Sequence, residues 1–189
     1  MPFQNRIEAA RELAKELIAY RGRNPLVLGI PRGAVPMAAV VAEALDGELD
    51  VVLVRKLGAP GNSELAIGSI SESGQVFLRD GVREAGVSQA YLDREIKQQL
   101  KVLRERRELY TPVRACADPA GRAVIIVDNG VATGSTMLAA LRSVRARGPE
   151  ELVAAMAVAP PDTVRAIEAE ADKVVVLETP ERFFAVGQF

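Results

Sequence analysis

The segment Val124–Thr136, whose sequence is VIIVDNGVATGST, determines the fold that we expect for this chain. Its beginning, Val124–Val127, is apolar without interruption, which is typical of a strand buried on both faces of a parallel sheet. Asp128 and Asn129 follow this strand, and an amphipathic pattern then predicts a helix at Thr136–Arg147. A buried strand joined to a helix by a short loop is the repeating unit of parallel α/β folds.

The same alternation extends along the chain in both directions. Short apolar runs predict strands at Leu26–Ile30, Asp50–Val54, Val124–Val127, Leu152–Val158 and Val174–Leu177. Helical spacing of apolar residues predicts helices at Phe3–Tyr20, Gly33–Leu45, Thr136–Arg147 and Asp162–Ala171. Because the strands lack polar alternation and helices separate them, we expect one doubly wound α/β domain over residues 1–189, with a mostly parallel sheet flanked by helices.

The middle of the chain has a different composition. Turn formers and basic residues predict a mobile loop at residues 55–68, with short strands near Leu65–Ile70 and Gln75–Leu78. Ser88 can cap a long helix that ends near Tyr110. Pairs of opposite charge four residues apart favour a solvated helix face, with contact to a second subunit or to RNA as the alternatives. These pairs are Asp93/Lys97, Lys101/Glu105 and Arg104/Glu108.

Composition excludes several classes of chemistry. Of the 189 residues 49% are hydrophobic and 26% charged, which is typical of a globular protein. The sequence contains no histidine and one cysteine, so Ser-His-Asp catalysis, Cys-His catalysis and soft-metal clusters are excluded. A metal would have to be a hard ion held by oxygen, such as Mg²⁺. The single cysteine, the absence of a long apolar run and the polar N-terminus lead us to expect a cytoplasmic protein with no membrane segment.

The loop after the strand has the chemistry of a phosphate site. Thr133-Gly134-Ser135-Thr136 opens a helix, where backbone N–H groups lack intrahelical acceptors and the dipole adds roughly half a positive charge. Asp128 and Asn129 offer oxygen acceptors for neighbouring hydroxyls, so the two parts together suit a ribose 5-phosphate. The alternative is that the loop only caps the helix and that Asp128 is a turn residue.

The segment Val124–Thr136 resembles the phosphoribosyl-pyrophosphate (PRPP) signature of type I phosphoribosyltransferases, which consists of an apolar strand, two acidic residues and a Thr-Gly-x-Thr loop. The resemblance implies that Asp128 and Asn129 contact the ribose hydroxyls, and that Asp128 reaches Mg²⁺ through those hydroxyls or water. It also implies a 5-phosphate site formed by Ala132, Thr133, Gly134, Ser135 and Thr136. Asn129 departs from the signature, since it replaces an acid and removes a charge.

Two further segments resemble parts of the same family. Arg32 and Gly33 follow the first predicted strand, where the family binds pyrophosphate. Arg55 and Lys56 resemble the basic pair that begins the family's flexible loop, and Glu64 is the carboxylate within that loop. An ordinary turn with a solvated Arg32, and a surface charge at Glu64, are the alternative interpretations.

The remaining family features concern the acceptor base. Ala132 occupies the position where purine-specific relatives often have an aspartate, so Glu64 or Lys56 would have to act as general base. Residues 179–189 resemble part of a hood, in which Phe183 or Phe184 would stack on the base, although both could also be core residues. The long helix has no counterpart in the minimal family fold, so residues 71–120 are expected to be an insertion.

The sequence therefore predicts a phosphoribosyltransferase that uses PRPP, Mg²⁺ and a nitrogenous base, with Asp128, Asn129, Glu64 and Lys56 as catalytic residues. The hood resemblance favours a purine. The resemblance also implies a homodimer, and the net charge of −1 argues against nucleic acid as a partner. A PRPP- or nucleotide-binding regulator without turnover is the alternative, and a structural protein with a vestigial site is a third possibility.

Overall fold

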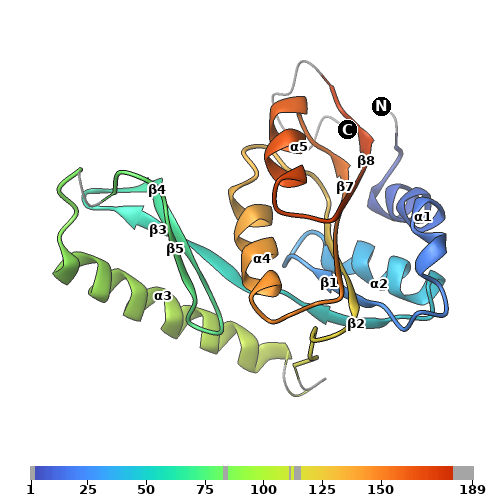
Figure 1. Cartoon of the computed structure of the whole chain (residues 1–189), viewed down its shortest axis with the longest axis horizontal. Coiled ribbons are helices and arrows are strands. Elements are labelled where there is room, and N and C mark those ends of the chain that lie inside the picture. Colours follow the sequence, from blue (N-terminus) through green and yellow to red (C-terminus); the bar gives the residue numbers. More distant parts are fainter. Residues whose placement is uncertain (1–2, 83–84, 111, 113–115, 181–189) are drawn as a thin grey trace. The chain divides into compact units, whose positions relative to one another are not determined.

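The computed structural model describes residues 3–82, 85–110, 112 and 116–180, apart from the side chains of Ser63 and Glu64 (Figure 1). The chain forms two compact units. The first unit comprises Met1–Val52 and Cys116–Phe189, and the second unit is the segment between them, Leu53–Ala115.

The first unit contains the predicted parallel sheet. Its five strands lie in the order β2-β1-β6-β7-β8, and every neighbouring pair is parallel. The strands are β1 (Leu26–Gly29), β2 (Glu48–Val51), β6 (Ala123–Asp128), β7 (Glu151–Val158) and β8 (Lys173–Glu178). From β1 the chain moves outward to β2, whereas from β6 it moves the other way, to β7 and β8. The connections therefore change direction between β1 and β6, at the position where open α/β sheets bind their ligands.

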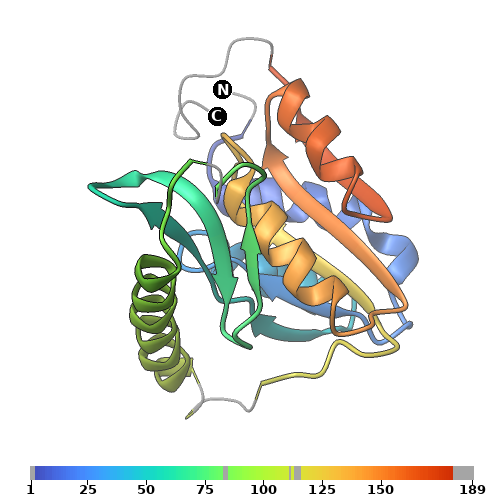
Figure 2. The same cartoon turned by 60° about the vertical axis from the view of Figure 1, so that its left-hand side comes forward.

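Helices cover both faces of this sheet, as predicted. They are α1 (Arg6–Glu16), α2 (Val35–Ala44), α4 (Ser135–Arg145) and α5 (Pro161–Glu168). Figure 2 shows α4 and α5 in front of the sheet, in orange and red, and α1 and α2 behind it, in blue. The core between the sheet and α1 and α2 takes alternate strand residues, among them Ile125 and Val127. Because side chains alternate along a strand, Asp128 belongs to the opposite face, which α4 and α5 cover.

The first predicted helix, Phe3–Tyr20, is wrong at both ends. The Asn5 side chain accepts hydrogen bonds from the backbone N–H groups of Ile7 and Glu8, at 2.9 and 3.0 Å, so α1 begins only at Arg6. At the other end α1 stops at Glu16, and a separate 3₁₀ helix follows at Ile18–Tyr20.

The second unit is a three-stranded antiparallel sheet with one long helix. Its elements are β3 (Val54–Ala59), β4 (Asn62–Ser71), β5 (Val76–Leu78) and α3 (Gln89–Tyr110). The mobile loop predicted at residues 55–68 is wrong, because these residues form the hairpin of β3 and β4. Pro60 and Gly61 make its two-residue turn, and Gly61 supplies the positive φ of 74°. The predicted strand Asp50–Val54 is likewise divided between β2 and β3.

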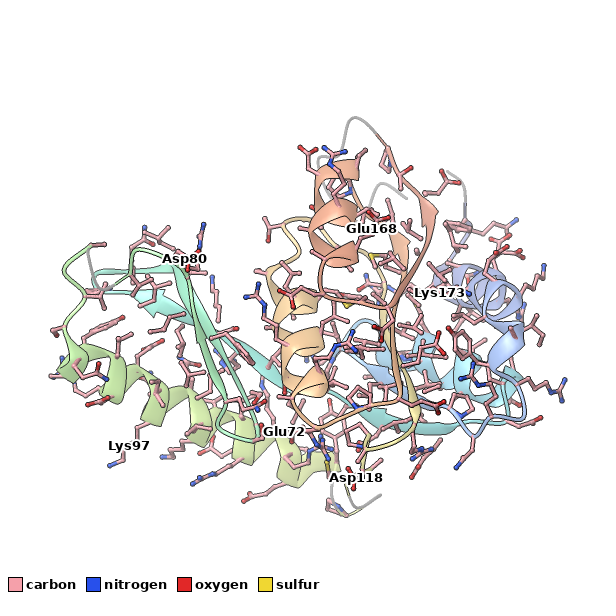
Figure 3. The ribbon with its side chains drawn as sticks, in the orientation of Figure 1. Glu72, Asp80, Lys97, Asp118, Glu168 and Lys173 are labelled. Atoms are coloured by element: carbon pink, nitrogen blue, oxygen red, sulfur yellow. The ribbon has the colours of Figure 1, made fainter. Side chains whose placement is uncertain are left out.

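Helix α3 is fixed to the sheet of the second unit by polar contacts at both ends. Near its start, the Tyr91 hydroxyl donates to the Gly58 carbonyl at 2.8 Å, and Glu95 accepts from the Gly58 N–H at 3.2 Å. Near its end, Arg107 and Glu72 form a bidentate ion pair with both distances 2.6 Å. The opposite side of α3 is charged and exposed, as Lys97 illustrates in Figure 3.

The second unit includes β3 and β4 as well as α3, so its bounds differ from the insertion expected at residues 71–120. The reason is that β3 pairs with β4 and not with the parallel sheet. In the described ranges, no helix is both long and apolar enough to cross a membrane. The expected hood at residues 179–189 falls almost entirely outside the described part of the chain.

Candidate functional site

Two loops meet where the connections of the parallel sheet diverge. Strands β1 and β6 are neighbours with Gly29 opposite Val127, and the Ile30 N–H donates to the Val127 carbonyl at 3.1 Å. Both strands therefore end at the same level of the sheet. The loop at residues 30–34, which precedes α2, and the loop at residues 129–134, which precedes α4, consequently lie at one edge.

Asp128 is the last residue of β6 and is half-buried at this edge. Burial raises the pKa of its carboxyl to about 6, although hydrogen bonds from the backbone N–H groups of Asn129 and Gly130 act in the opposite direction. The Asn129 N–H donates to Asp128 Oδ1 at 2.8 Å. A carboxylate that is partly withdrawn from water is stabilised in its charged form by further hydrogen bonds, so it is suited to accept them from a ligand.

Asn129 brings the two loops into contact. A Cβ atom placed on Gly33 would lie 3.0 Å from Asn129 Oδ1, which is closer than ordinary van der Waals contact. The lack of a side chain at Gly33 is therefore what allows the amide of Asn129 to lie against the first loop. Arg32, beside it, is exposed, and the Pro31–Arg32 peptide bond is cis. The structure thus brings together Arg32, Gly33, Asp128 and Asn129 at one edge of the sheet.

The predicted phosphate loop has an open, polar outer side. Ala132, Thr133, Ser135 and Thr136 are exposed, whereas Gly134 is buried with a φ of 78°. Helix α4 begins directly after Gly134, and no described side chain caps it by a hydrogen bond. The first N–H groups of an α-helix lack intrahelical acceptors and favour an anion. The loop can therefore offer backbone N–H groups and the hydroxyls of Thr133, Ser135 and Thr136 to one phosphate.

The phosphate loop is held from behind by residues that the sequence analysis did not identify. The Val131 N–H donates to the Val158 carbonyl at the end of β7, at 2.9 Å. The Thr163 hydroxyl, on α5, donates to the Ala132 carbonyl at 2.7 Å. In the sequence, Thr163 is only a threonine near the start of the predicted helix Asp162–Ala171, and residue type there does not identify a hydrogen-bond partner.

The basic pair Arg55 and Lys56 lies in the second unit. The two residues occupy consecutive positions on β3, so their side chains point to opposite faces of the antiparallel sheet. The Arg55 guanidinium donates to the Gln99 side chain on α3, and burial, together with the nearby positive charge of Arg106, lowers its pKa. Lys56 is exposed on the other face. Within its unit, Arg55 therefore packs with α3, and Lys56 is the more accessible of the two.

Three predicted site residues fall outside what the structure describes, namely the side chain of Glu64 and the residues Phe183 and Phe184. In the described part of the chain, no three His, Cys, Asp or Glu side chains are close enough to form a metal cluster. Asp128 and Asn129 do offer oxygen atoms, and Mg²⁺ usually takes only one or two carboxylates together with substrate phosphates and water. The donors at this site fit that mode of binding.

A parallel sheet with a half-buried aspartate and a Thr-Gly-Ser-Thr loop where its connections diverge defines an α/β protein of the phosphoribosyltransferase class. The model of the phosphoribosyl transferase domain family matches residues 3–188, which is nearly the whole chain. The chain therefore belongs to the phosphoribosyl transferase family.

Similar proteins agree with this assignment. A Mycobacterium tuberculosis protein named "Putative phosphoribosyl transferase" is 43% identical over 187 residues, which is 98% of this chain but 42% of that protein. The chain thus spans less than half the length of this curated relative. The crystal structure of TT1426 from Thermus thermophilus is 47% identical, with a TM-score of 0.87 over 98% of this chain and 88% of that chain.

More distant structures share the fold alone. The purine phosphoribosyltransferase from Pyrococcus horikoshii is 16% identical, with a TM-score of 0.52 over 95% of this chain and 93% of that chain. A hypoxanthine-guanine phosphoribosyltransferase from Bacillus anthracis has the same TM-score of 0.52 at 15% identity, over 93% of this chain and 79% of that one. The type I phosphoribosyltransferase fold predicted from the sequence is confirmed.

Proposed function

We propose that this chain transfers the 5-phosphoribosyl group of PRPP to a nitrogenous base in a reaction that requires Mg²⁺. A ring nitrogen of the base would form a bond to the anomeric carbon while the bond from that carbon to the pyrophosphate oxygen breaks. The pyrophosphate leaves with the bonding electron pair, and the base loses its N–H proton to a general base or to water. The products are a nucleoside monophosphate and pyrophosphate.

One observation carries the proposal, which is the pairing of Asp128 with the phosphate loop at a single edge of the sheet. The half-buried carboxylate ends β6, and the exposed hydroxyls of Thr133, Ser135 and Thr136 follow within one loop. A ribose 5-phosphate carries vicinal hydroxyls at one end and a dianionic phosphate at the other. The carboxylate suits the hydroxyls and the start of α4 suits the phosphate.

Each remaining residue of the site has a role in this reaction. Asp128 would stabilise the positive charge that develops at the anomeric carbon, and Asn129 would bind a ribose hydroxyl. Gly33 would let backbone N–H groups approach the pyrophosphate, whose charge Arg32 and Lys56 would neutralise. Arg55 would assist in binding the substrate if its hydrogen bond to Gln99 were broken.

Mg²⁺ would be held by Asp128 through ribose hydroxyls or water, and by the pyrophosphate itself. When bound, the ion would supply positive charge to the leaving pyrophosphate. For the acceptor we propose a purine, on the basis of the resemblance of residues 179–187 to a purine hood. Phe183 or Phe184 would then stack on the base, and Glu64 or Lys56 would take its proton. We also propose a cytoplasmic homodimer that binds neither membranes nor nucleic acid.

The experiment is a panel assay with PRPP, Mg²⁺ and a series of purine and pyrimidine bases, in which pyrophosphate release is measured. The proposal predicts release with at least one base, and faster release with purines. The same panel with EDTA tests the metal, because release should stop when Mg²⁺ is removed. Tight PRPP binding without release for any base would contradict catalysis.

A second candidate function is a PRPP- or nucleotide-binding regulator without turnover. It is favoured by Asn129, which replaces an acid and lies against Gly33, and by the exposed Ala132, which has no carboxylate. Calorimetry on the same samples separates the two functions. A regulator binds PRPP and releases nothing, and a protein with a vestigial site does not bind PRPP at all.

A further inference from the structure

Thr163 lies against the phosphate loop without being part of it. It is the third residue of α5 and is only 8% exposed. Its hydroxyl donates to the Ala132 carbonyl at 2.7 Å. Its methyl group limits the space at Gly134, since a Cβ atom on that glycine would lie 3.0 Å from Thr163 Cγ2. We infer that Thr163 is a positioning residue, which sets the orientation of the Thr133 N–H for binding a phosphate monoester.

The orientation follows from the planarity of the peptide bond. In a trans peptide, the carbonyl of one residue and the N–H of the next point in opposite directions. The Ala132 carbonyl points toward α5, because it accepts the Thr163 hydroxyl. The N–H of Thr133 must therefore point away from α5, toward the open side of the loop. Rotation of this peptide plane would move the N–H away and would break the hydrogen bond.

The loop is tied by two hydrogen bonds to the end of β7 and the start of α5. At Val131, one residue before Ala132 in the chain, the backbone N–H donates to the Val158 carbonyl at 2.9 Å. Gly134 has a φ of 78°, a conformation that glycine adopts readily and that lets α4 begin at the next residue. The loop is thus held by hydrogen bonds at its entry and its middle, and Thr163 limits the space at its exit. Only the middle contact depends on a side-chain hydroxyl.

A fixed loop binds a phosphate more tightly than a mobile loop with the same donors. Donors that already point at the ligand lose less conformational entropy when the ligand binds. Thr163 itself need not touch the phosphate, because it acts through the Ala132–Thr133 peptide. This inference rests on the proposed function as far as ligand affinity is concerned, but the orientation of the Thr133 N–H can be measured without any ligand.

Three variants separate this role from a structural one. Thr163→Val keeps nearly the same shape, including the methyl group near Gly134, but removes the hydroxyl. Thr163→Ser keeps the hydroxyl and removes the methyl group. Ile167→Val is the matched control, since Ile167 is fully buried one turn further along α5. Thermal denaturation of all three shows whether Thr163→Val and Ile167→Val lose similar stability.

The first readout is the Kd for PRPP and for ribose 5-phosphate, measured by calorimetry with Mg²⁺. Thr163→Val should weaken both by about two- to tenfold, because binding must then order a loop segment that the hydroxyl holds in the wild type. Thr163→Ser should recover most of the affinity, and Ile167→Val should bind as the wild type does. Equal affinity of Thr163→Val and the wild type would overturn the inference, and so would an equal loss in Thr163→Val and Ile167→Val.

The second readout is the ¹⁵N relaxation of the Thr133 N–H in the ligand-free protein. Thr163→Val should make this N–H more mobile than in the wild type, whereas Ile167→Val should not. Unchanged mobility in Thr163→Val would refute the positioning role. If the wild type bound neither PRPP nor ribose 5-phosphate, the proposed function would fail, and this measurement would still decide the role of Thr163.

Discussion

Replacing the carboxyl of Asp128 by an amide should make the ligand-free protein more stable at alkaline pH. Burial raises the pKa of Asp128 from 3.8 to about 6, so the folded protein holds this proton more tightly than the unfolded chain does. The associated stability is fully present below about pH 4 and is lost as the pH rises to about 6. Above pH 6, the folded state keeps a charged group that is poorly solvated.

The magnitude follows from this pKa difference. At about 1.4 kcal/mol for each pKa unit, the charged carboxylate costs about 3 kcal/mol of folding free energy at pH 8. Asp128→Asn removes that cost but offers a single acceptor oxygen to the N–H groups of Asn129 and Gly130. We therefore expect a net gain of about 1–2 kcal/mol at pH 8, after subtracting one weakened hydrogen bond. At pH 4 we expect no gain.

Urea denaturation at pH 4 and pH 8 measures the effect directly. The matched control is Asp118→Asn, because Asp118 is 78% exposed in its ion pair with Arg147 and its charge remains solvated. For Asp128→Asn, the midpoint should rise relative to the wild type at pH 8 only, and for Asp118→Asn it should show no such rise. A loss of stability in Asp128→Asn at pH 8, or an equal gain at both pH values, would refute the reasoning.

Three further predictions concern ligand binding and the two glycines of the site. If ligand hydroxyls donate to Asp128, binding lowers its pKa, so calorimetry at pH 6 should detect the release of up to about half a proton, and none at pH 8. Gly33→Ala should displace Asn129, which lies 3.0 Å from the added Cβ, and should reduce PRPP affinity several-fold at a cost of about 1–3 kcal/mol in urea denaturation. Gly134→Ala should lose about 1–2 kcal/mol because its φ is 78°, and thermal denaturation should show this loss before any ligand is added. A proton release at pH 8, or either glycine variant behaving like the wild type, would contradict these assignments.

The parallel sheet could be predicted because each of its strands carries its own signal. The run Val124–Val127 is fully buried in the structure, and only a strand covered on both faces buries such a run completely. Asp128 and the phosphate loop around Gly134 follow this run within the same short segment. One stretch of sequence therefore contained both the carboxylate and the phosphate loop of the candidate site. Local sequence was therefore sufficient for this part of the molecule.

The rest depended on contacts between distant residues. Pro60 and Gly61 are compatible with a mobile loop as well as with a hairpin, and the pairing of β3 with β4 decides between the two. The contact between Gly33 and Asn129 joins two loops that are far apart in the sequence. The same is true of Thr163, whose partner is a backbone carbonyl of Ala132. Every residue has a backbone carbonyl, so the residue type at a position does not indicate whether its carbonyl accepts a side-chain hydrogen bond.

The central claim is that PRPP binds at Asp128, the last residue of β6, and at the loop that follows it. Calorimetry of PRPP with Mg²⁺ tests this claim most directly. The samples are the wild type, Asp128→Ala and the exposed-site control Asp118→Ala. Loss of a charged hydrogen-bond acceptor predicts that Asp128→Ala binds PRPP at least about tenfold more weakly, while Asp118→Ala binds as the wild type does. Equal PRPP affinity in the wild type and Asp128→Ala would contradict the assignment of the site.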